Sequence, residues 1–431
     1  MGNRSIIFRS LLACLLVVAC SNKEKLDGSR EEIILPDDDA EFESNPTSDL
    51  LMENAEFANR EVPQPFMNAT HCYSPLKFST NPIERWTSTL DFCGNDSIRM
   101  TASPLLAEGK VFCLDGAGIV YAIDSGSGKR IWRTSTLVKG KDGQIGGAVA
   151  YYGGKLIVTS SFAECFLLDA GSGKILWRIK LPAPCKGDGI TVSEGKAFIM
   201  CSNNSLQVIQ IDNGKTIWSH SGTMQNSSFL GSASVAIDDG MVFLAYSSGE
   251  IFALSADTGS VIWDSAFSKF SLTNSAHSFT HPRACPVVAG DLVYFCASNE
   301  QTVAFDKKNG NRRWACNIGG LQTPSVSGSS IFVLCPKSTL ACLNRYTGKL
   351  RWRCQLESDV DMFSDWYGQL LVGGHILMIS PRGKFLFVSP DGKIKRTINV
   401  TDKKDSLSVN PIIVDGVLYL LLNNGTLGAF H

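Results

Sequence analysis

The stretch Gly173-Lys174-Ile175-Leu176-Trp177 decides the fold, because its outline, Gly-x-x-x-Trp, recurs along most of the chain. Six full copies carry the glycines Gly128, Gly173, Gly214, Gly259, Gly310 and Gly348 and the tryptophans Trp132, Trp177, Trp218, Trp263, Trp314 and Trp352. A degenerate copy begins at Gly392 and has Arg396 in place of the tryptophan. Successive copies are roughly 40–50 residues apart, which is the period of a β-propeller blade with four short strands.

Each copy also has the strands that a blade needs. Strand-like runs such as 120–124 and 303–306 precede the glycine, and a hairpin such as 104–112 lies further upstream. This order places the glycine in the turn between the third and fourth strands, where a positive φ is needed. It places the tryptophan on the outermost strand, from which the ring can wedge between blades and the indole N–H can reach a backbone carbonyl of the next blade.

The two ends of the repeat region predict how the ring closes. The segment 425–431 aligns with the third strand of a blade that has no fourth strand after it. The segment 83–89, with Trp86, reads as a fourth strand with no blade before it. We expect this N-terminal strand to complete the last blade, which removes an open sheet edge. Counting Trp86, the six copies and Arg396, the sequence predicts an all-β propeller of eight four-stranded antiparallel blades over residues 66–431, with seven blades as the alternative.

The N-terminus predicts export and a lipid anchor. Arg4 and Arg9 precede the apolar run 11–18, as in a signal peptide. Val-Val-Ala before Cys20 resembles a lipobox, so residues 1–19 would be removed and Cys20 acylated; an ordinary cleavage after Ala19 is the alternative. Residues 20–65 are rich in Asp, Glu, Asn, Ser and Pro and are expected to be a disordered acidic tether.

Composition and motifs give no support for an enzyme or a nucleic-acid-binding protein. The 431 residues have a formal net charge of −1, which provides no electrostatic footprint for nucleic acid. No nucleophile elbow, zinc-protease motif or phosphate-binding loop occurs, and the Gly-Ser-Gly-Lys stretches at 126–129 and 171–174 belong to the repeat turns. His277 and His281 are four residues apart but have no carboxylate nearby, so we expect no metal site and no catalytic residue.

The cysteines raise the question of disulfides. Besides Cys14 and Cys20, twelve of the fourteen cysteines remain in the mature chain. Several recur at comparable repeat positions in different blades, which lie too far apart to bridge, so buried free thiols are the expected state. Cys285 and Cys296 face each other across one expected hairpin and are the best candidates for a disulfide.

With the repeat in register, residues from about Arg60 to His431 resemble the pyrroloquinoline-quinone-like β-propeller repeat family. Within it the chain is most similar to the BamB group, lipoproteins of the outer-membrane β-barrel assembly machinery (BAM complex). The lipobox, a single propeller of this length, closure by the N-terminal strand and the run Val62-Pro-Gln64 ahead of Trp86 carry this likeness. The resemblance implies a scaffold at the periplasmic face of the outer membrane, with no cofactor and no enzymatic activity.

The resemblance also implies a partner and a contact surface. Proteins of the BamB group bind the periplasmic POTRA domains of BamA, together with other BAM subunits, and assist insertion of outer-membrane proteins. The contact uses loops between central blades, which correspond here to Phe229 and Leu230 after Trp218. In the next loop, His281 and Arg283 stand where an acidic pair is usual, so this chain departs from the group at its contact.

Two other functions compete with this one. The first is a lipid-anchored periplasmic propeller with a different protein partner, because propellers are generic platforms. The second is a quinone-dependent dehydrogenase, since the repeat is named for that cofactor. Such enzymes resemble larger propellers with adjacent cysteines and a calcium site, whereas this chain has no Cys-Cys dipeptide.

Overall fold

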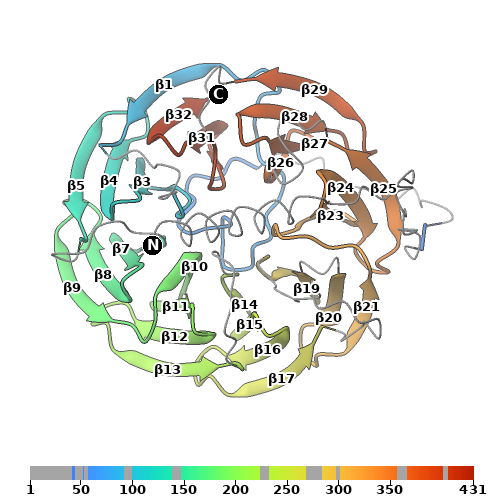
Figure 1. Cartoon of the computed structure of the whole chain (residues 1–431), viewed down its shortest axis with the longest axis horizontal. Helices are drawn as coiled ribbons and strands as arrows, with labels where there is room; N and C mark the ends of the chain where they lie inside the picture. The colour runs from blue at the N-terminus through green and yellow to red at the C-terminus, as the bar shows by residue number, and fades with distance from the viewer. Residues whose placement is uncertain are drawn as a thin grey trace, which may run out of the picture. The chain divides into compact units, whose positions relative to one another are not determined.

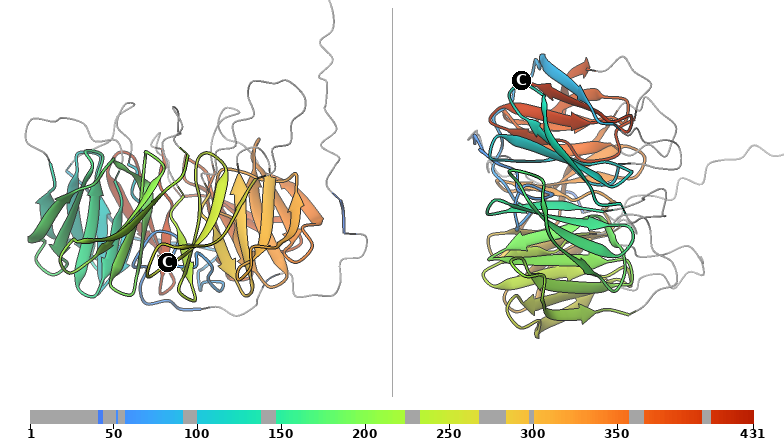
Figure 2. Two further views of the ribbon diagram at one scale, coloured as in Figure 1. Left: turned by 90° about the horizontal axis from the view of Figure 1, so that it is seen from below. Right: turned by 90° about the vertical axis from the view of Figure 1, so that its left-hand side faces the viewer.

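The computed structural model describes residues 41–43, 52, 57–91, 100–137, 147–223, 233–267, 284–297, 301–356, 366–400 and 406–431. In these ranges, 32 β-strands form eight four-stranded antiparallel sheets, which stand as blades around a ring (Figure 1). Seen from the side, the blades make a ring about one strand length thick (Figure 2). The eight-bladed propeller predicted from the repeat is therefore confirmed, and the alternative of seven blades is wrong.

The first four blades run in chain order from the centre outward. Blade 1 contains β2 (Leu105–Ala107), β3 (Lys110–Leu114), β4 (Ile119–Asp124) and β5 (Arg130–Ser135). Blade 2 contains β6 (Val149–Tyr152), β7 (Lys155–Ser160), β8 (Glu164–Asp169) and β9 (Ile175–Lys180). Blade 3 contains β10 (Cys185–Ser193), β11 (Lys196–Cys201), β12 (Ser205–Gln210) and β13 (Thr216–Ser221). Blade 4 contains β14 (Ala236–Asp238), β15 (Met241–Ala245), β16 (Glu250–Ser255) and β17 (Val261–Ala266).

The remaining blades follow the same order until the last. Blade 5 contains β18 (Val287–Ala289), β19 (Leu292–Ala297), β20 (Gln301–Asp306) and β21 (Arg312–Cys316). Blade 6 contains β22 (Ser325–Ser327), β23 (Ser330–Cys335), β24 (Thr339–Asn344) and β25 (Leu350–Gln355). Blade 7 contains β26 (Tyr367–Val372), β27 (His375–Ile379), β28 (Lys384–Val388) and β29 (Ile394–Asn399). Blade 8 contains β30 (Ile412–Val414), β31 (Val417–Leu421), β32 (Thr426–Phe430) and β1 (Glu84–Thr89).

The ring is closed by β1, which pairs antiparallel with β32 and brings Trp86 opposite Ala429. The backbones of Ile83 and His431 exchange two hydrogen bonds of 2.8 and 3.0 Å just before this ladder. The predicted closure by the N-terminal strand is thus confirmed. Because every sheet now has four strands, the ring has no blade that lacks its outer edge.

The hydrophobic core lies between blades rather than at one centre. Second and third strands such as β7 and β8 are buried along nearly their whole length, whereas outer strands such as β9 alternate between exposed and half-buried residues. Each of seven clusters joins neighbouring blades; one contains Phe112 of blade 1 and Phe166 of blade 2. Strands that pack on both faces appear in the sequence as continuous apolar runs, so the inner strands of the blades could be predicted from it. No helix among the described residues is long and apolar enough to cross a membrane.

Candidate functional site

The Gly-x-x-x-Trp repeat forms a chain of contacts around the ring. Each of its six tryptophans, and likewise Trp86 of β1, donates its indole N–H to a backbone carbonyl oxygen of the next blade. The pairs are Trp86–Ser125 (3.0 Å), Trp132–Ala170 (3.1 Å), Trp177–Ile211 (2.9 Å), Trp218–Ala256 (3.1 Å), Trp263–Lys307 (2.9 Å), Trp314–Arg345 (2.9 Å) and Trp352–Pro390 (2.7 Å). In blade 7, Arg396 stands at the tryptophan's position and donates to Asn81 Oδ1 at 2.8 Å.

The glycine of the repeat serves the blade before it as well as its own turn. Gly259 has a φ of +72°, and a Cβ at this position would lie 2.6 Å from the ring of Trp218. A side chain is therefore excluded both by the backbone conformation and by the indole of blade 3. The repeat is thus a structural feature that links each blade to the next, and it leaves chemistry to other parts of the ring.

The centre of the ring is occupied by the chain itself. Residues 59–76 follow the innermost strands around the ring and contact the blades in order, and this segment lies in blue at the centre of Figure 1. The contacts are Asn59–Ile413 and Asn59–Asp415 (blade 8), Val62–Leu106 (blade 1), Pro63–Tyr151 (blade 2), Gln64–Val192 (blade 3), Ala69–Ile237 (blade 4), Thr70–Val288 (blade 5), Cys72–Val326 (blade 6) and Leu76–Leu371 (blade 7). We call residues 59–76 the hub segment.

A small cavity lies beside the hub segment. A cavity of about 50 Å³ is lined by His71 and Tyr73 of the hub segment and by Ser103 of blade 1. A space of this size holds a water molecule or two, whereas pockets for cofactors and other small molecules are of the order of 300–1,000 Å³. Among the described residues, this cavity offers no room for a quinone.

Two buried titratable groups lie beside the hub. Asp188 accepts hydrogen bonds from the backbone N–H and the hydroxyl of Ser103, at 2.8 and 2.6 Å, and burial raises its pKa to about 6. His71 Nδ1 donates to the carbonyl oxygen of Pro286 at 2.7 Å, and burial lowers the pKa of the imidazole to about 4. Asp188 belongs to blade 3, whereas His71 contacts blades 4 and 5. The two titratable groups therefore lie in different surroundings.

The residues predicted to touch a partner lie outside the described ranges. Phe229 and Leu230 fall in 224–232, which connects β13 to β14, and His281 and Arg283 fall in 268–283, which connects β17 to β18. Cys20 and the pair His277 and His281 are likewise outside the described residues. The structure therefore does not test these predictions, but it does describe the residues that immediately precede the first connector.

A polar and aromatic platform lies where β13 ends, at the foot of the first connector. The ring of His220 stacks on Tyr246 with a centroid distance of 5.8 Å, and its Nδ1 is 2.8 Å from the tyrosine hydroxyl. Glu250 accepts hydrogen bonds from the N–H and hydroxyl of Thr223, at 2.8 and 2.9 Å. Asn204 donates to the Thr223 carbonyl at 2.9 Å, so blades 3 and 4 both hold this end of β13 in place.

The charges of the platform follow from its partial burial. Burial lowers the pKa of His220, with Glu250 acting in the opposite direction. Burial raises the pKa of Glu250, but hydrogen bonds from Ser248 and Thr223 outweigh it, and the net pKa is lowered. At neutral pH the platform therefore presents a neutral imidazole and a carboxylate that is already hydrogen-bonded. No sequence motif marks these residues, because they come from four different strands and turns.

The predicted disulfide between Cys285 and Cys296 is wrong. The Cys285 sulfur accepts a hydrogen bond from the Ser234 N–H at 3.2 Å, at the start of blade 4, while the Cys296 sulfur accepts one from the Gly320 N–H at 3.1 Å, between blades 5 and 6. The two thiols thus face different neighbours. Burial raises the pKa of Cys285 to about 11, so it is a protonated thiol at neutral pH.

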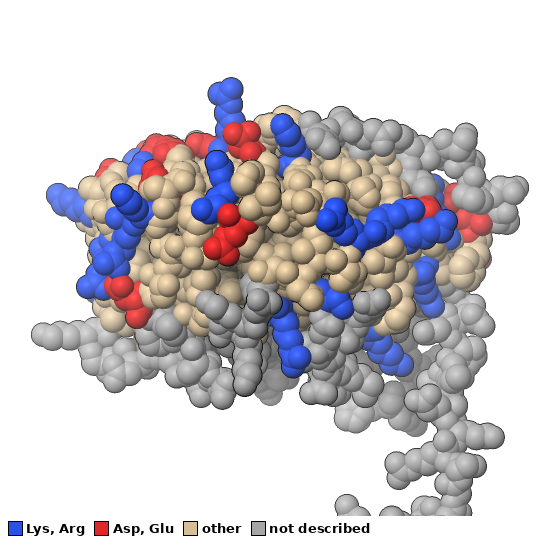
Figure 3. Space-filling view, turned by 90° about the horizontal axis from the view of Figure 1, so that it is seen from above, with Lys and Arg blue, Asp and Glu red and all other residues tan. Residues whose placement is uncertain are grey.

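Within the described ranges, no cluster of three or more His, Cys, Asp or Glu side chains could hold a metal ion. Charged residues of both signs are scattered over the face that Figure 3 presents, where Lys and Arg cover more of the surface than Asp and Glu. The described residues bring together three features. They are the series of indole hydrogen bonds between blades (the indole chain), the hub segment, and the platform at blades 3 and 4. All three are suited to holding a rigid ring and presenting its surface.

Comparison with known proteins places this ring in a family. A family model described as "Outer membrane protein assembly factor BamB" matches residues 116–354. BamB of Shewanella oneidensis is 23% identical over 364 residues, which cover 80% of this chain and 88% of that protein. The crystal structure of BamB from Moraxella catarrhalis has a TM-score of 0.68 at 17% identity and covers 81% of this chain and 100% of its own.

The same ring also occurs in enzymes. The quinohemoprotein alcohol dehydrogenase of Comamonas testosteroni has a TM-score of 0.64 at 14% identity, covering 86% of this chain and 80% of that one. At such identities a structural likeness shows the fold alone. Fold and repeat together define a propeller of the pyrroloquinoline-quinone-like repeat class. Within this class, the chain belongs to the family of the outer membrane protein assembly factor BamB, whose model covers more than half of its 431 residues.

Proposed function

We propose that this protein is a non-enzymatic scaffold subunit of the outer-membrane β-barrel assembly (BAM) complex. In this proposal it is a lipoprotein anchored through Cys20 at the periplasmic face of the outer membrane. It binds the POTRA domains of BamA and assists the insertion of outer-membrane proteins. The observation that carries the proposal is the BamB family match over residues 116–354, which runs from β4 of blade 1 into β25 of blade 6.

The geometry supports a scaffold in two ways. The hub segment occupies the ring centre and leaves a cavity of about 50 Å³, which is too small for a redox cofactor. Indole N–H groups tie seven of the eight blades to the next, and Arg396 makes the remaining contact, so loops between blades are presented by a rigid frame. The platform at the end of β13 fixes the described start of the connector that carries Phe229 and Leu230, which we propose as partner contacts together with His281 and Arg283.

The test is capture by the periplasmic region of BamA from the same organism. We expect wild-type protein to be recovered, and the double variant Phe229→Asp, Leu230→Asp to be recovered at least about tenfold less, since apolar anchors in a contact carry most of its energy. Ile131→Asp is the matched control, because Ile131 is an exposed apolar residue on the outer strand of blade 1.

The outcomes separate the alternatives. Full recovery of the double variant would move the contact to other loops and leave the assignment standing. Failure to recover the wild type would favour a periplasmic propeller with another partner. Saturable binding of pyrroloquinoline quinone with calcium would instead support the dehydrogenase.

A further inference from the structure

The first residue of the outermost strand is buried in blade 6, whereas the corresponding residue is exposed to solvent in blades 1 to 3. In β5, β9 and β13 the first two residues are exposed. In β25 the first residue, Leu350, is only 1% exposed and belongs to the core cluster that joins blades 5 and 6. Because β25 is the last strand of its sheet, its own blade cannot cover this edge.

The cover is a short segment that precedes the hub by about fifteen residues. Glu43 donates its backbone N–H to the Leu350 carbonyl at 2.9 Å, and Leu350 donates its own N–H to the Glu41 carbonyl at 2.9 Å. Phe42 thereby forms a parallel β-bridge with Leu350. Residues 41–43 act as a fifth strand on blade 6 and satisfy backbone groups that an edge strand leaves open.

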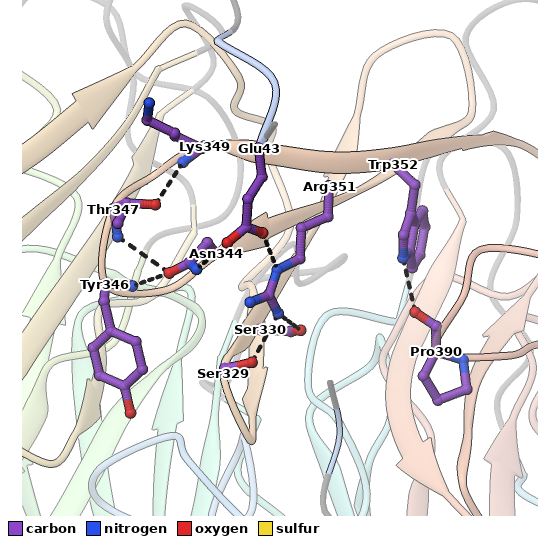
Figure 4. A network of polar contacts seen from close by, with 10 residues as sticks. All are labelled: Glu43, Ser329, Ser330, Asn344, Tyr346, Thr347, Lys349, Arg351, Trp352 and Pro390. Atoms are coloured by element: carbon purple, nitrogen blue, oxygen red, sulfur yellow. Dashed lines mark hydrogen bonds and ion pairs between the residues drawn. The ribbon is translucent and has the colours of Figure 1, made fainter. Parts of the chain in front are cut away.

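The side chains of this added strand meet a matching pair on β25 (Figure 4). Glu43 Oε2 is 2.7 Å from Arg351 Nε, and Glu43 Oε1 accepts a hydrogen bond from Asn344 Nδ2 at 2.8 Å. Two residues earlier, Glu41 pairs with Lys349 at 3.1 Å. Since side chains two residues apart on a strand share a face, Glu41 and Glu43 match Lys349 and Arg351 in register.

The two ion pairs differ in burial. The Arg351 side chain is 2% exposed, and its Nη1 donates to the hydroxyls of Ser329 and Ser330 at 2.8 Å each. A guanidinium buried in this way is costly unless a carboxylate faces it, and Glu43 is the carboxylate that the structure places there. The Glu41–Lys349 pair is largely exposed and contributes little. Glu43 is therefore the anchor of the strand.

The burial of Arg351 sets it apart from the residues at the same position in other blades. The residue before the repeat tryptophan is an exposed aliphatic side chain in blades 1 to 4, namely Ile131, Leu176, Ile217 and Ile262. In blade 5 it is Arg313, which pairs with Asp306 of its own blade at 2.8 Å. Among these outer strands, β25 alone combines an inward-facing arginine with a carboxylate from outside the sheet.

We propose that the outer edge of blade 6 is a binding site for an extended acidic peptide strand, and that its occupant is Glu41–Glu43 of the same chain. The site recognises a strand by two backbone hydrogen bonds and a carboxylate that reaches Arg351. Because the occupant is covalently linked, its effective concentration is in the millimolar range, which keeps the site filled in the isolated protein. Docking holds residues 41–43 at the rim of blade 6. The proposal does not depend on the function assigned above.

Amide hydrogen exchange on the full chain tests the docking. We expect the Leu350 amide to exchange at least about tenfold faster in Glu43→Ala, because that variant leaves a buried guanidinium without its carboxylate. The control Glu41→Ala removes an exposed pair from the same strand and should change the rate by less than about fivefold. Protection of amides in β23 reports that blade 6 stays folded. An unchanged Leu350 rate in Glu43→Ala, with β23 protected, would overturn the proposal.

Binding in trans tests the site itself. A labelled peptide of residues 38–46 should bind saturably to full-length Glu43→Ala, whose own strand is released, and at least about tenfold more weakly to the wild type, whose site is filled. The same peptide carrying Glu43→Ala should not bind. Absence of binding to the vacated variant, or equal binding by the two peptides, would refute recognition of an acidic strand.

Discussion

At the residue scale, the two buried titratable groups beside the hub segment make the stability of the fold depend on pH in opposite directions. The folded pKa of Asp188, about 6, is above its ordinary value of 3.8, so between these pH values the folded state binds more protons than the unfolded state. Its contribution to stability therefore falls as the pH rises through this window. His71 has a folded pKa of about 4, below its ordinary 6.5, so its contribution rises with pH over nearly the same range.

The substitution Asp188→Asn should separate the pH dependence that Asp188 contributes from that of His71. It keeps a side chain that suits the positive φ of 56° at this position, and it removes the titration. We expect the free energy of unfolding of the variant, relative to wild type, to increase by up to about 3 kcal/mol between pH 4 and 6 and to level off above that. Denaturant unfolding at several pH values measures this difference.

Asp415→Asn is the matched control, because Asp415 is exposed and also has a positive φ, of 47°. Its unfolding curves should run parallel to those of wild type across the same pH range. If the Asp188→Asn curves run parallel as well, another group is responsible for the pH dependence.

At the scale of the element, β1 closes the ring through backbone hydrogen bonds. The Ile83 N–H donates to the His431 carbonyl at 2.8 Å, although the Ile83 side chain is 60% exposed. Ile83→Pro should lower the free energy of unfolding by about 1–3 kcal/mol, because proline removes the donor while little buried surface is lost. Ile83→Ala keeps the donor and should stay within about 0.5 kcal/mol of wild type. Equal effects of the two would show that closure does not depend on this bond.

The elements that could be predicted from the sequence are those that side chains mark. The repeat positions occupied by Gly259 and Trp218 recur in register, because a left-handed turn and a ring packed between blades each admit few residue types. Blade number and ring closure could therefore be predicted. The hub segment could not, since its contacts at Val62, Ala69 and Thr70 run through the backbone and leave no side-chain pattern. Glu43 and Arg351 are 308 residues apart, a separation at which no local period links them.

The candidate site was predictable only in outline. The resemblance pointed to the connectors around Phe229 and His281, but His220, Tyr246 and Glu250 form their platform only once blades 3 and 4 stand side by side. The disulfide prediction failed for a related reason. Sequence spacing placed Cys285 opposite Cys296, whereas the neighbouring blades supply each thiol with its own hydrogen-bonding partner.

At the scale of the whole molecule, the proposed lipid on Cys20 would attach the ring to a membrane through the segment that ends in the strand on blade 6. If Cys20 is acylated, the stretch of chain between the lipid and the first contact with the ring ends at Glu41 when the blade 6 strand is docked, and further along the chain when it is released. The docked strand would thus keep the ring nearer to the bilayer.

The lipid anchor itself can be tested by fractionation of cells. Cys20→Ser removes the thiol that would be acylated, so the protein should move from the membrane fraction to the soluble periplasmic fraction with its propeller still folded. Cys14→Ser, six residues earlier in the same signal segment, leaves the Val-Val-Ala-Cys run intact and should stay in the membrane. Two or three acyl chains hold a protein stably where one does not, which makes the expected shift nearly complete. Cys20→Ser protein that remains in the membrane fraction with residues 1–19 removed, as intact mass would show, would mean that contacts of the ring with a membrane partner suffice to hold it there.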